Sequence, residues 1–247
     1  MTTPLTTSLP TSGRLAWWGT AWLRGTVVTD LAVDAVIGTD ATHRVVGLGE
    51  AEVHQGIAGA LGALRTAGVE HVGLAWPAEG DPAGLGGPLE LNAAALDAGE
   101  AAIAGRVALV PRREGAVVFW QAYDANPRPL TDVGEADRTL RTALLTTAQE
   151  LAALDVARWR PEVADELMDL RHPPRLDAPP GVPPRCVDLA GRALQAAAIV
   201  DLAFGDEGAA VTAAEAGRRR ESLRGLATAA RHALVAACSP EVWPPGV

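Results

Sequence analysis

The sequence predicts an α/β protein, with α+β as the alternative: a mixed sheet of about four strands with flanking helices, followed by a mainly helical C-terminal half. Short apolar runs alternate with amphipathic stretches in the first half, whereas apolar residues recur at helical spacing in the second. We therefore divide the chain into a disordered tail at 1–13, an α/β region at 14–130, and a helical region at 131–247 with a proline-rich connector at 171–184. This connector either separates two domains or wraps around a single compact one.

Composition and net charge limit the classes of protein to which this chain can belong. The chain has 247 residues, 48% of them hydrophobic and 21% charged, which is ordinary for a globular protein. A net charge of −9 disfavours a nucleic-acid-binding protein, which needs a basic surface. The sequence has no apolar run of about 18 residues, and we expect no signal peptide because its first residues lack a basic flank and an apolar stretch. Its two cysteines are typical of reduced core thiols. We expect a cytoplasmic protein that binds neither nucleic acid nor membrane.

The sequence lacks the residues that several kinds of catalysis require. All 21 strongly basic residues are arginine, so this chain supplies no Walker A lysine and no Schiff-base lysine. None of the four serines lies in a G-x-S-x-G nucleophile elbow. H-E-x-x-H and C-x-x-C are also missing, so we predict neither a metal site nor a cofactor. The sequence assigns no catalytic residue.

The first elements follow from apolar spacing. Residues 14–37 predict two helices, the first with Leu15, Trp18, Trp22 and Gly25 on one face and the second capped by Thr29. The three tryptophans of this stretch form either a packing cluster or an interface. The next predicted elements are a strand at 43–48, a helix at 50–67 stopped by Gly68, and a strand at 69–76.

The stretch from 76 to 92, W-P-A-E-G-D-P-A-G-L-G-G-P-L-E-L-N, connects this strand to the next helix. Its glycines permit close backbone approach, and Pro88 suits the first helical position with Gly87 as N-cap. The start of a helix attracts anions, but this loop carries only acids and departs from G-x-G-x-x-G. The loop is either purely structural or a ligand site completed by arginines of the other half. The candidate ligand-binding residues are Glu79, Asp81, Gly84, Gly86, Gly87, Asn92, Arg158 and Arg160.

A helix at 89–104 follows, and then strands at 106–110 and 116–123. The connection between these strands has five residues, P-R-R-E-G, which predicts an antiparallel hairpin. The predicted element order of the first half is therefore β-α-β-α-β-β.

The second half begins with a capping box formed by Asp132 and Glu135, which starts a helix that runs to about residue 158. A short helix at 162–170 precedes the connector. The helix at 186–204 is apolar on most sides and is predicted to be buried, with Asp201 needing an arginine partner. The last helix spans 212–238, and its residues 218–220 are expected to face solvent. Its predicted core face consists of Leu223, Leu226, Ala230, Ala233 and Ala237.

Cys186 is the one candidate reactive thiol. It follows Arg185 at the start of a helix, where the dipole and the guanidinium would lower its pKa. A catalytic cysteine needs a base, and no histidine has a motif connection to it. An inert core thiol is the preferred interpretation.

Five segments of the sequence are similar to segments of a known group of proteins. They are W-W-G-T-A-W-L-R-G at 17–25, G-D-P-A-G-L-G-G-P at 80–88, D-V-G-E-A-D-R-T-L-R at 132–141, D-V-A-R-W-R-P-E-V-A-D at 155–165, and R-C-V-D-L-A at 185–190. Together they resemble an uncharacterised protein family of high-GC actinobacteria along nearly the whole chain. The resemblance implies a bacterial cytoplasmic origin and transfers no catalytic residue.

Two classes of function follow. The first is a non-catalytic interaction or scaffold protein that self-associates as a homo-oligomer or binds a protein partner, with the tryptophans and the Ala-rich helices at the interface. The alternative is a small-molecule-binding protein or enzyme that uses the loop at 77–92. The missing catalytic motifs favour the first class, and the strand-loop-helix pattern favours the second.

Overall fold

A computed structural model describes residues 8–49, 55–153, 172–205 and 213–244. Its centre is a mixed five-stranded sheet in the order β1-β5-β4-β3-β2. Strand β1 runs parallel to β5, and every other neighbouring pair is antiparallel. The predicted mixed sheet with flanking helices is confirmed, with five strands rather than about four. The strands are β1 (Thr42–Val46), β2 (Gly73–Ala75), β3 (Ala101–Ala104), β4 (Val107–Glu114) and β5 (Val117–Asp124).

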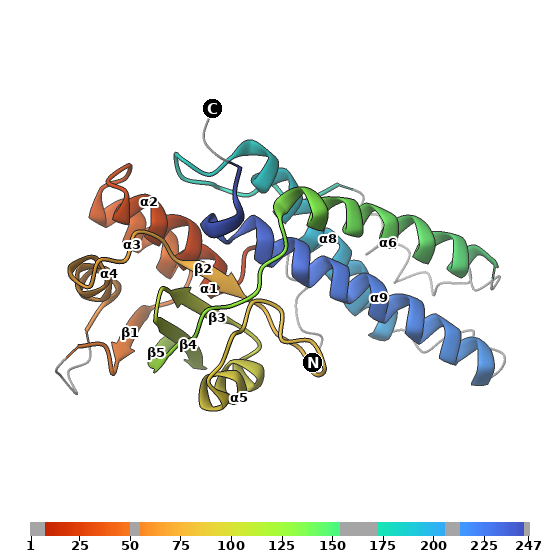
Figure 1. Cartoon of the computed structure of the whole chain (residues 1–247), viewed down its shortest axis with the longest axis horizontal. Coiled ribbons are helices and arrows are strands. Elements are labelled where there is room, and N and C mark those ends of the chain that lie inside the picture. Colours follow the sequence, from red (N-terminus) through yellow and green to blue (C-terminus); the bar gives the residue numbers. More distant parts are fainter. Residues whose placement is uncertain (1–7, 50–54, 154–171, 206–212, 245–247) are drawn as a thin grey trace.

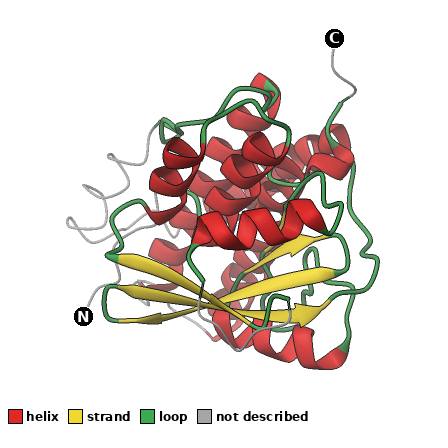
Figure 2. Ribbon diagram, turned by 90° about the vertical axis from the view of Figure 1, so that its left-hand side faces the viewer, coloured by secondary structure: helices red, strands yellow, loops and turns green. Residues whose placement is uncertain are grey.

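Helices cover both faces of this sheet. Helix α5 packs on one face through a small cluster that includes Leu91 and Ala95, and most of the other helices lie on the opposite face (Figures 1 and 2). The described helices are α1 (Thr11–Arg14), the π-helical η1 (Leu15–Gly19), α2 (Thr20–Leu23), α3 (Thr29–Ile37), α4 (Ile57–Thr66), α5 (Leu89–Ala98), α6 (Val133–Ala153), α8 (Pro184–Gly205), α9 (Ala213–Ala237) and the 3₁₀ turn η2 (Pro240–Val242).

Strand β3 corrects the prediction of one helix over 89–104. Helix α5 ends at Ala98 because Gly99 adopts a left-handed conformation with φ of 76°. The chain then turns back, and Ala101–Ala104 pairs with β2 on one side and β4 on the other. Every residue of this strand is buried. Alanine has a high helix propensity, but the narrow space between two strands and two packed faces overrides it.

The N-terminal helix also differs from the predicted pattern. Segments α1, η1 and α2 follow one another without a break, so the helix begins at Thr11, inside the stretch predicted to be a disordered tail. Its π-helical turn changes which side chains share one face of the helix. Trp17 is fully buried, whereas Trp22 is partly exposed. Trp22 packs instead against the guanidinium of Arg65, 3.5 Å from the ring centre. Thr29 does not cap α3; its hydroxyl accepts a hydrogen bond from Trp22 Nε1 at 2.9 Å.

The loop at 76–92, called the central loop below, has three boundaries near it that differ from the prediction. Helix α4 begins only at Ile57, and residues 50–54 lie outside the described part of the chain. Gly68 follows α4 with φ of 78° and donates to Arg65 O at 3.0 Å, which confirms it as the stop. Strand β2 spans only three residues, and Pro88 rather than Gly87 is the N-cap of α5.

In the second half, the capping prediction at Asp132 is confirmed. Its Oδ1 accepts hydrogen bonds from Gly134 N at 2.7 Å and Glu135 N at 3.3 Å. The predicted end of this helix near residue 158 and the predicted short helix at 162–170 lie outside the described residues.

Helices α8 and α9 lie where they were predicted, and the five residues of the predicted α9 core face are buried. Two details are wrong. Asp201 is exposed rather than buried, although partial burial still raises its pKa and the charge of Arg231 on α9 opposes that rise. Arg219 is buried and donates to Ala203 O at 3.0 Å, so it does not face solvent with its neighbours.

The proline-rich connector packs along the body of the protein. Leu176, Ala178 and Val182 contact the main hydrophobic core, and Pro173 lies against Gly191 of α8. The hydroxyl of Thr26 donates to the backbone oxygen of residue 180 at 3.3 Å. The described part of this segment is therefore held by contacts with both halves of the chain.

One hydrophobic core joins the two halves of the chain. It includes Trp17, Leu74 and Trp120 from the first half together with Leu194 and Leu234 from the second. The indole Nε1 of Trp17 donates to the backbone oxygen at position 237 at 3.2 Å, so the first helix is hydrogen-bonded to the end of α9. Among the described helices, none is long and apolar enough to cross a membrane.

The tight packing of the central loop gives a testable difference between two glycines. A Cβ atom at Gly86 would lie 2.3 Å from Pro127 O, whereas a Cβ at Gly62 in α4 meets no atom within 4 Å. We expect Gly86→Ala to lower the free energy of unfolding by at least about 1 kcal/mol because backbone must move. Gly62→Ala should raise the free energy of unfolding by about 0.5–1 kcal/mol through helix propensity. Urea unfolding measures both, and equal stability of the two variants would contradict this packing.

Candidate functional site

A groove between α6 and α9 forms a large cavity in the described part of the chain. The two helices run antiparallel, and Thr147 Oγ1 donates to Ser222 O at 3.3 Å across their contact (Figure 1). The cavity has a volume of about 770 Å³. We call it the α6–α9 groove; its lining residues are Thr131, Glu135, Ala136, Thr139, Ala143, Thr146, Thr147, Glu150, Arg218, Glu221, Ser222, Gly225, Leu226, Thr228, Ala229 and His232.

The floor of the groove is made of small side chains, because both helices place alanine or glycine where they approach each other. Ala136 and Ala229 are almost fully buried, and Ala143 and Gly225 also belong to the lining. Hydroxyl groups and charges make up most of the remaining lining. The antiparallel register of the helices puts Glu135 and His232 at one end of the groove and residues 150 and 218 at the other. Such a surface can accept another polypeptide closely.

Asp81 of the central loop lies at the His232 end. Its Oδ1 accepts a hydrogen bond from His232 Nε2 at 2.9 Å, and its Oδ2 accepts from Arg231 Nε at 3.1 Å. Ala83 N donates to Oδ1 as well, at 3.3 Å. Burial by itself would raise the pKa of Asp81, but the hydrogen bonds from His232 and Arg231 outweigh it, so the pKa is lowered. The histidine ring, which also lines the groove, is thereby oriented by a carboxylate.

The candidate ligand residues of the loop are mostly engaged in holding the loop itself. Asn92 Oδ1 accepts from Gly87 N at 3.0 Å. Gly84 has φ of 85°, and a Cβ there would lie 2.8 Å from Leu74 O, so only glycine fits at this position. Gly86 is pressed against the backbone of residue 127 in the same way. These contacts shape the loop and fasten it to the rest of the chain.

Three other candidate residues were predicted, namely Glu79, Arg158 and Arg160. Glu79 is exposed. Arg158 and Arg160 lie outside the described residues. The basic partner that meets Asp81 is Arg231, which no local feature of the sequence links to the loop. Sequence reasoning also missed His232, because 151 residues separate it from Asp81.

Arg128 is a further residue that sequence reasoning missed. Its Nη1 donates to Leu74 O at 2.7 Å and Gly84 O at 3.1 Å, and its Nη2 donates to Ser239 Oγ at 3.2 Å and Glu241 Oε1 at 2.7 Å. The side chain is only 5% exposed. One guanidinium thus holds the end of β2, the central loop and the turn after α9 together.

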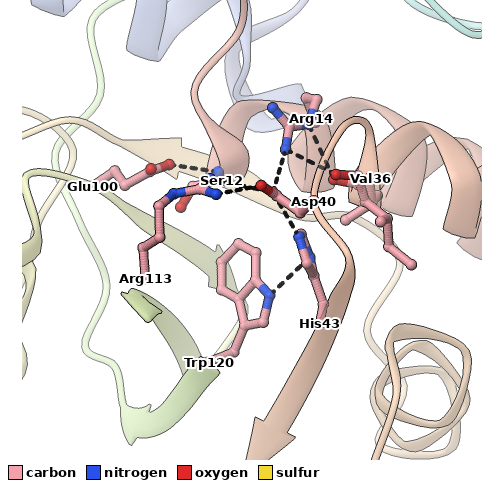
Figure 3. A network of polar contacts seen from close by, with 9 residues as sticks. Ser12, Arg14, Val36, Asp40, His43, Glu100, Arg113 and Trp120 are labelled. Carbon is pink, nitrogen blue, oxygen red and sulfur yellow. Dashed lines mark hydrogen bonds and ion pairs between the residues drawn. The ribbon is translucent and has the colours of Figure 1, made fainter. Parts of the chain in front are cut away.

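A polar network at the β1 edge of the sheet is structural. Asp40 accepts hydrogen bonds from Arg14, from Arg113 and, at 3.0 Å, from His43 Nε2 (Figure 3). Trp120 Nε1 can only donate, and it lies 3.2 Å from His43 Nδ1, so the proton of His43 is on Nε2. Burial lowers the pKa of His43, although Asp40 opposes this shift. Both ring nitrogens are therefore occupied, and the side chain is fully buried.

Glu100 belongs to the same region and caps the first helix. Its Oε2 accepts from Ser12 N at 2.6 Å (Figure 3). Burial raises the pKa of Glu100, while the hydrogen bonds at the start of the helix act against that increase. A smaller cavity of about 530 Å³ adjoins it, lined also by Arg113 and Tyr123. Within the described ranges, no group of three or more His, Cys, Asp or Glu side chains is arranged to hold a metal ion.

Cys186 lies in the core rather than at an open helix start. The residue is fully buried, and burial raises the pKa of its thiol to about 11, against the smaller opposite effect of Arg185. The shift is opposite in direction to the lowering that the helix dipole and the arginine suggested, because desolvation of the thiolate dominates. Cys238 is also buried and free, and its pKa is raised as well.

Two family models match this chain. Residues 12–133 match the model described as "Rv1486c-like protein, N-terminal domain", and residues 134–235 match "Rv1486c-like protein, C-terminal domain". The two matches meet at the start of α6, three residues beyond the predicted end of the α/β region. No curated protein and no solved structure matches the chain.

The carboxylate of Asp81 should contribute to stability in a pH-dependent way. Its folded pKa is lowered, so the contribution is complete above the ordinary aspartate pKa of about 4 and is lost as the pH falls through the lower folded pKa. We expect Asp81→Asn to reduce the free energy of unfolding at pH 7 by about 1–3 kcal/mol, since Asn turns an amide toward Arg231 or His232. The difference from wild type should shrink as the pH approaches about 2.

The matched control is Glu79→Gln, which removes an exposed carboxylate two residues away and should change stability by less than about 0.5 kcal/mol. Urea titrations at about pH 7, 4 and 2.5 provide the measurement. A pH-independent loss in the Asp81 variant would show that packing rather than charge is responsible.

The environment of Cys186 predicts slow alkylation. With a pKa of about 11 and no exposed surface, the thiolate is almost unpopulated at neutral pH. Iodoacetamide should label Cys186 slowly in the folded protein and quickly in urea, as followed by mass spectrometry of the peptide that contains it. Rapid labelling of the folded protein at neutral pH would restore the reactive-thiol hypothesis.

Proposed function

Because the chain belongs to the Rv1486c-like family, to which no activity is assigned, we propose a function from its surface: a non-catalytic interaction protein that self-associates through the α6–α9 groove. The observation that carries this proposal is the groove itself. Two long helices form it, and its floor of alanine and glycine lets another helix approach closely.

The shape of the groove favours a polypeptide over a compact small molecule. From Glu135 to Glu150 the lining follows α6 over 15 residues, or about 22 Å at 1.5 Å per residue. Lining residues recur every three or four positions on both helices, which is the spacing that a partner helix would meet. The cavity is therefore elongated along the helices.

The expected contribution of the tryptophans to the interface is revised. Trp17 and Trp18 are buried within the core, so they are not available to a second molecule. The Ala-rich helices remain, and they carry the proposal. The alternative of a ligand site in the loop at 77–92 has less support, because Asp81 and Asn92 already bond within the chain.

Filling the groove should therefore prevent self-association. Ala143 is half-buried in the lining, and a tryptophan there would occupy part of the groove. We expect the wild-type protein to sediment as a dimer at micromolar concentration and Ala143→Trp to raise the dissociation constant at least about tenfold, through steric exclusion.

The control for this experiment is Ala148→Trp, which places the same side chain on an exposed position of α6 outside the groove. It should dimerise like wild type in analytical ultracentrifugation, and circular dichroism should show both variants folded. A monomeric wild-type protein at about 100 μM, a concentration far above what a specific dimer needs, would overturn the proposed function.

A further inference from the structure

The charges at the two ends of the α6–α9 groove identify what occupies it. We propose that the occupant is the same α6–α9 face of a second copy, related by a two-fold axis that runs along the groove, so that α6 of each copy packs over α9 of the other. This inference rests on the proposed function and specifies its partner surface.

The area of this face is sufficient for a specific contact. Helix α6 has 21 residues and is about 31 Å long, and two neighbouring helices present a face about 18–20 Å wide. Each copy would then bury about 600 Å², or about 1,200 Å² in total, which exceeds the roughly 1,000 Å² expected of a biological interface. Such a contact builds an antiparallel four-helix arrangement from two helix pairs.

The charge pattern selects the orientation. The bond between Thr147 and Ser222 sets the register of the helices, with Glu150 and Arg218 at one end. A two-fold axis along the groove brings equal ends together, because it leaves positions along the helices unchanged. It therefore sets Glu150 of each copy over Arg218 of the other, and the two contacts join opposite charges.

Two contacts within each copy act on the charges at this end. Ser222 Oγ donates a hydrogen bond to Glu150, which holds the carboxylate beside α9 before a second copy arrives. Glu221 also lies at this end, but Arg224 of its own helix is 3.7 Å away and counters its charge. Glu150 thus remains the acid that Arg218 of a second copy would meet.

At the opposite end the same axis sets Glu135 over His232 of the second copy. His232 is 40% exposed, lines the groove and is held by Asp81, so it is oriented before any contact forms. The other face-to-face arrangement, with the axis across the groove, packs α6 over α6 and sets Glu135 against Glu150. Two such like-charge contacts per dimer oppose that arrangement.

A charge-exchange experiment tests this orientation. Glu150→Arg and Arg218→Glu each create two like-charge contacts in a homodimer, and each should raise the dissociation constant at least about tenfold. A heterodimer of the two variants has one contact between the introduced arginine and the introduced glutamate, and one contact between the native Glu150 and the native Arg218. Dimerisation of an equimolar mixture should therefore return to within about threefold of wild type. Both positions are exposed, so both variants should fold.

Native mass spectrometry distinguishes the heterodimer from the two homodimers, and Glu90→Arg on exposed α5 controls for the change in net charge. Wild-type affinity in both single variants, or a mixture that stays monomeric, would overturn this orientation. If Ala143→Trp still abolishes the dimer in that case, the groove is the interface and only its pairing is wrong. A monomeric wild-type protein overturns both proposals.

Discussion

The loop between β2 and α5, which is buried at Asp81 and at 83–85, is the constraint on which the rest of this structure depends. A loop that packs against α9 must pair its buried polar groups, because no water is available to them. Asp81 meets this need by accepting hydrogen bonds from Arg231 and His232, and Arg128 meets it by donating to the backbone of Leu74 and Gly84. These bonds join the sheet to the last helix, so the two halves share one core.

The same constraint explains which parts of the fold follow from sequence. Helices α6, α8 and α9 are predictable because their apolar periodicity and caps are local properties, determined within one or two turns of the chain. The β4–β5 hairpin is predictable for the same reason, but the predicted five-residue connection is wrong: β4 continues to Glu114, and only Gly115 and Ala116 connect the two strands. Strand β3 is not, because its alanines have a helical preference and become a strand only between β2 and β4.

The candidate site is predictable only in part. The sequence identifies Asp81 as a polar contact of the loop and predicts that arginines from the second half complete a ligand site there. The arginine that the structure brings to Asp81 is Arg231, whereas Arg158 and Arg160 lie outside the described residues. A local cluster of arginines in the sequence does not reveal which side of a long helix faces the sheet. The glycines of the loop predict that another group approaches the backbone closely, but they do not predict which group. At Gly84 and Gly86 that group is the backbone of the chain itself.

The helical half has an asymmetry that follows from these bonds. Helix α9 is the central element, with α8 packed on one side and α6 on another, while α6 and α8 share few contacts. The alanines of α9 permit close packing on several sides, and its end is held at Asp81 and Trp17. Because α6 contributes the second wall and small residues form the floor, the groove stays open along its length. The small residues that let α9 pack against its neighbours, such as Gly225 and Ala229, therefore also leave a surface suited to another helix.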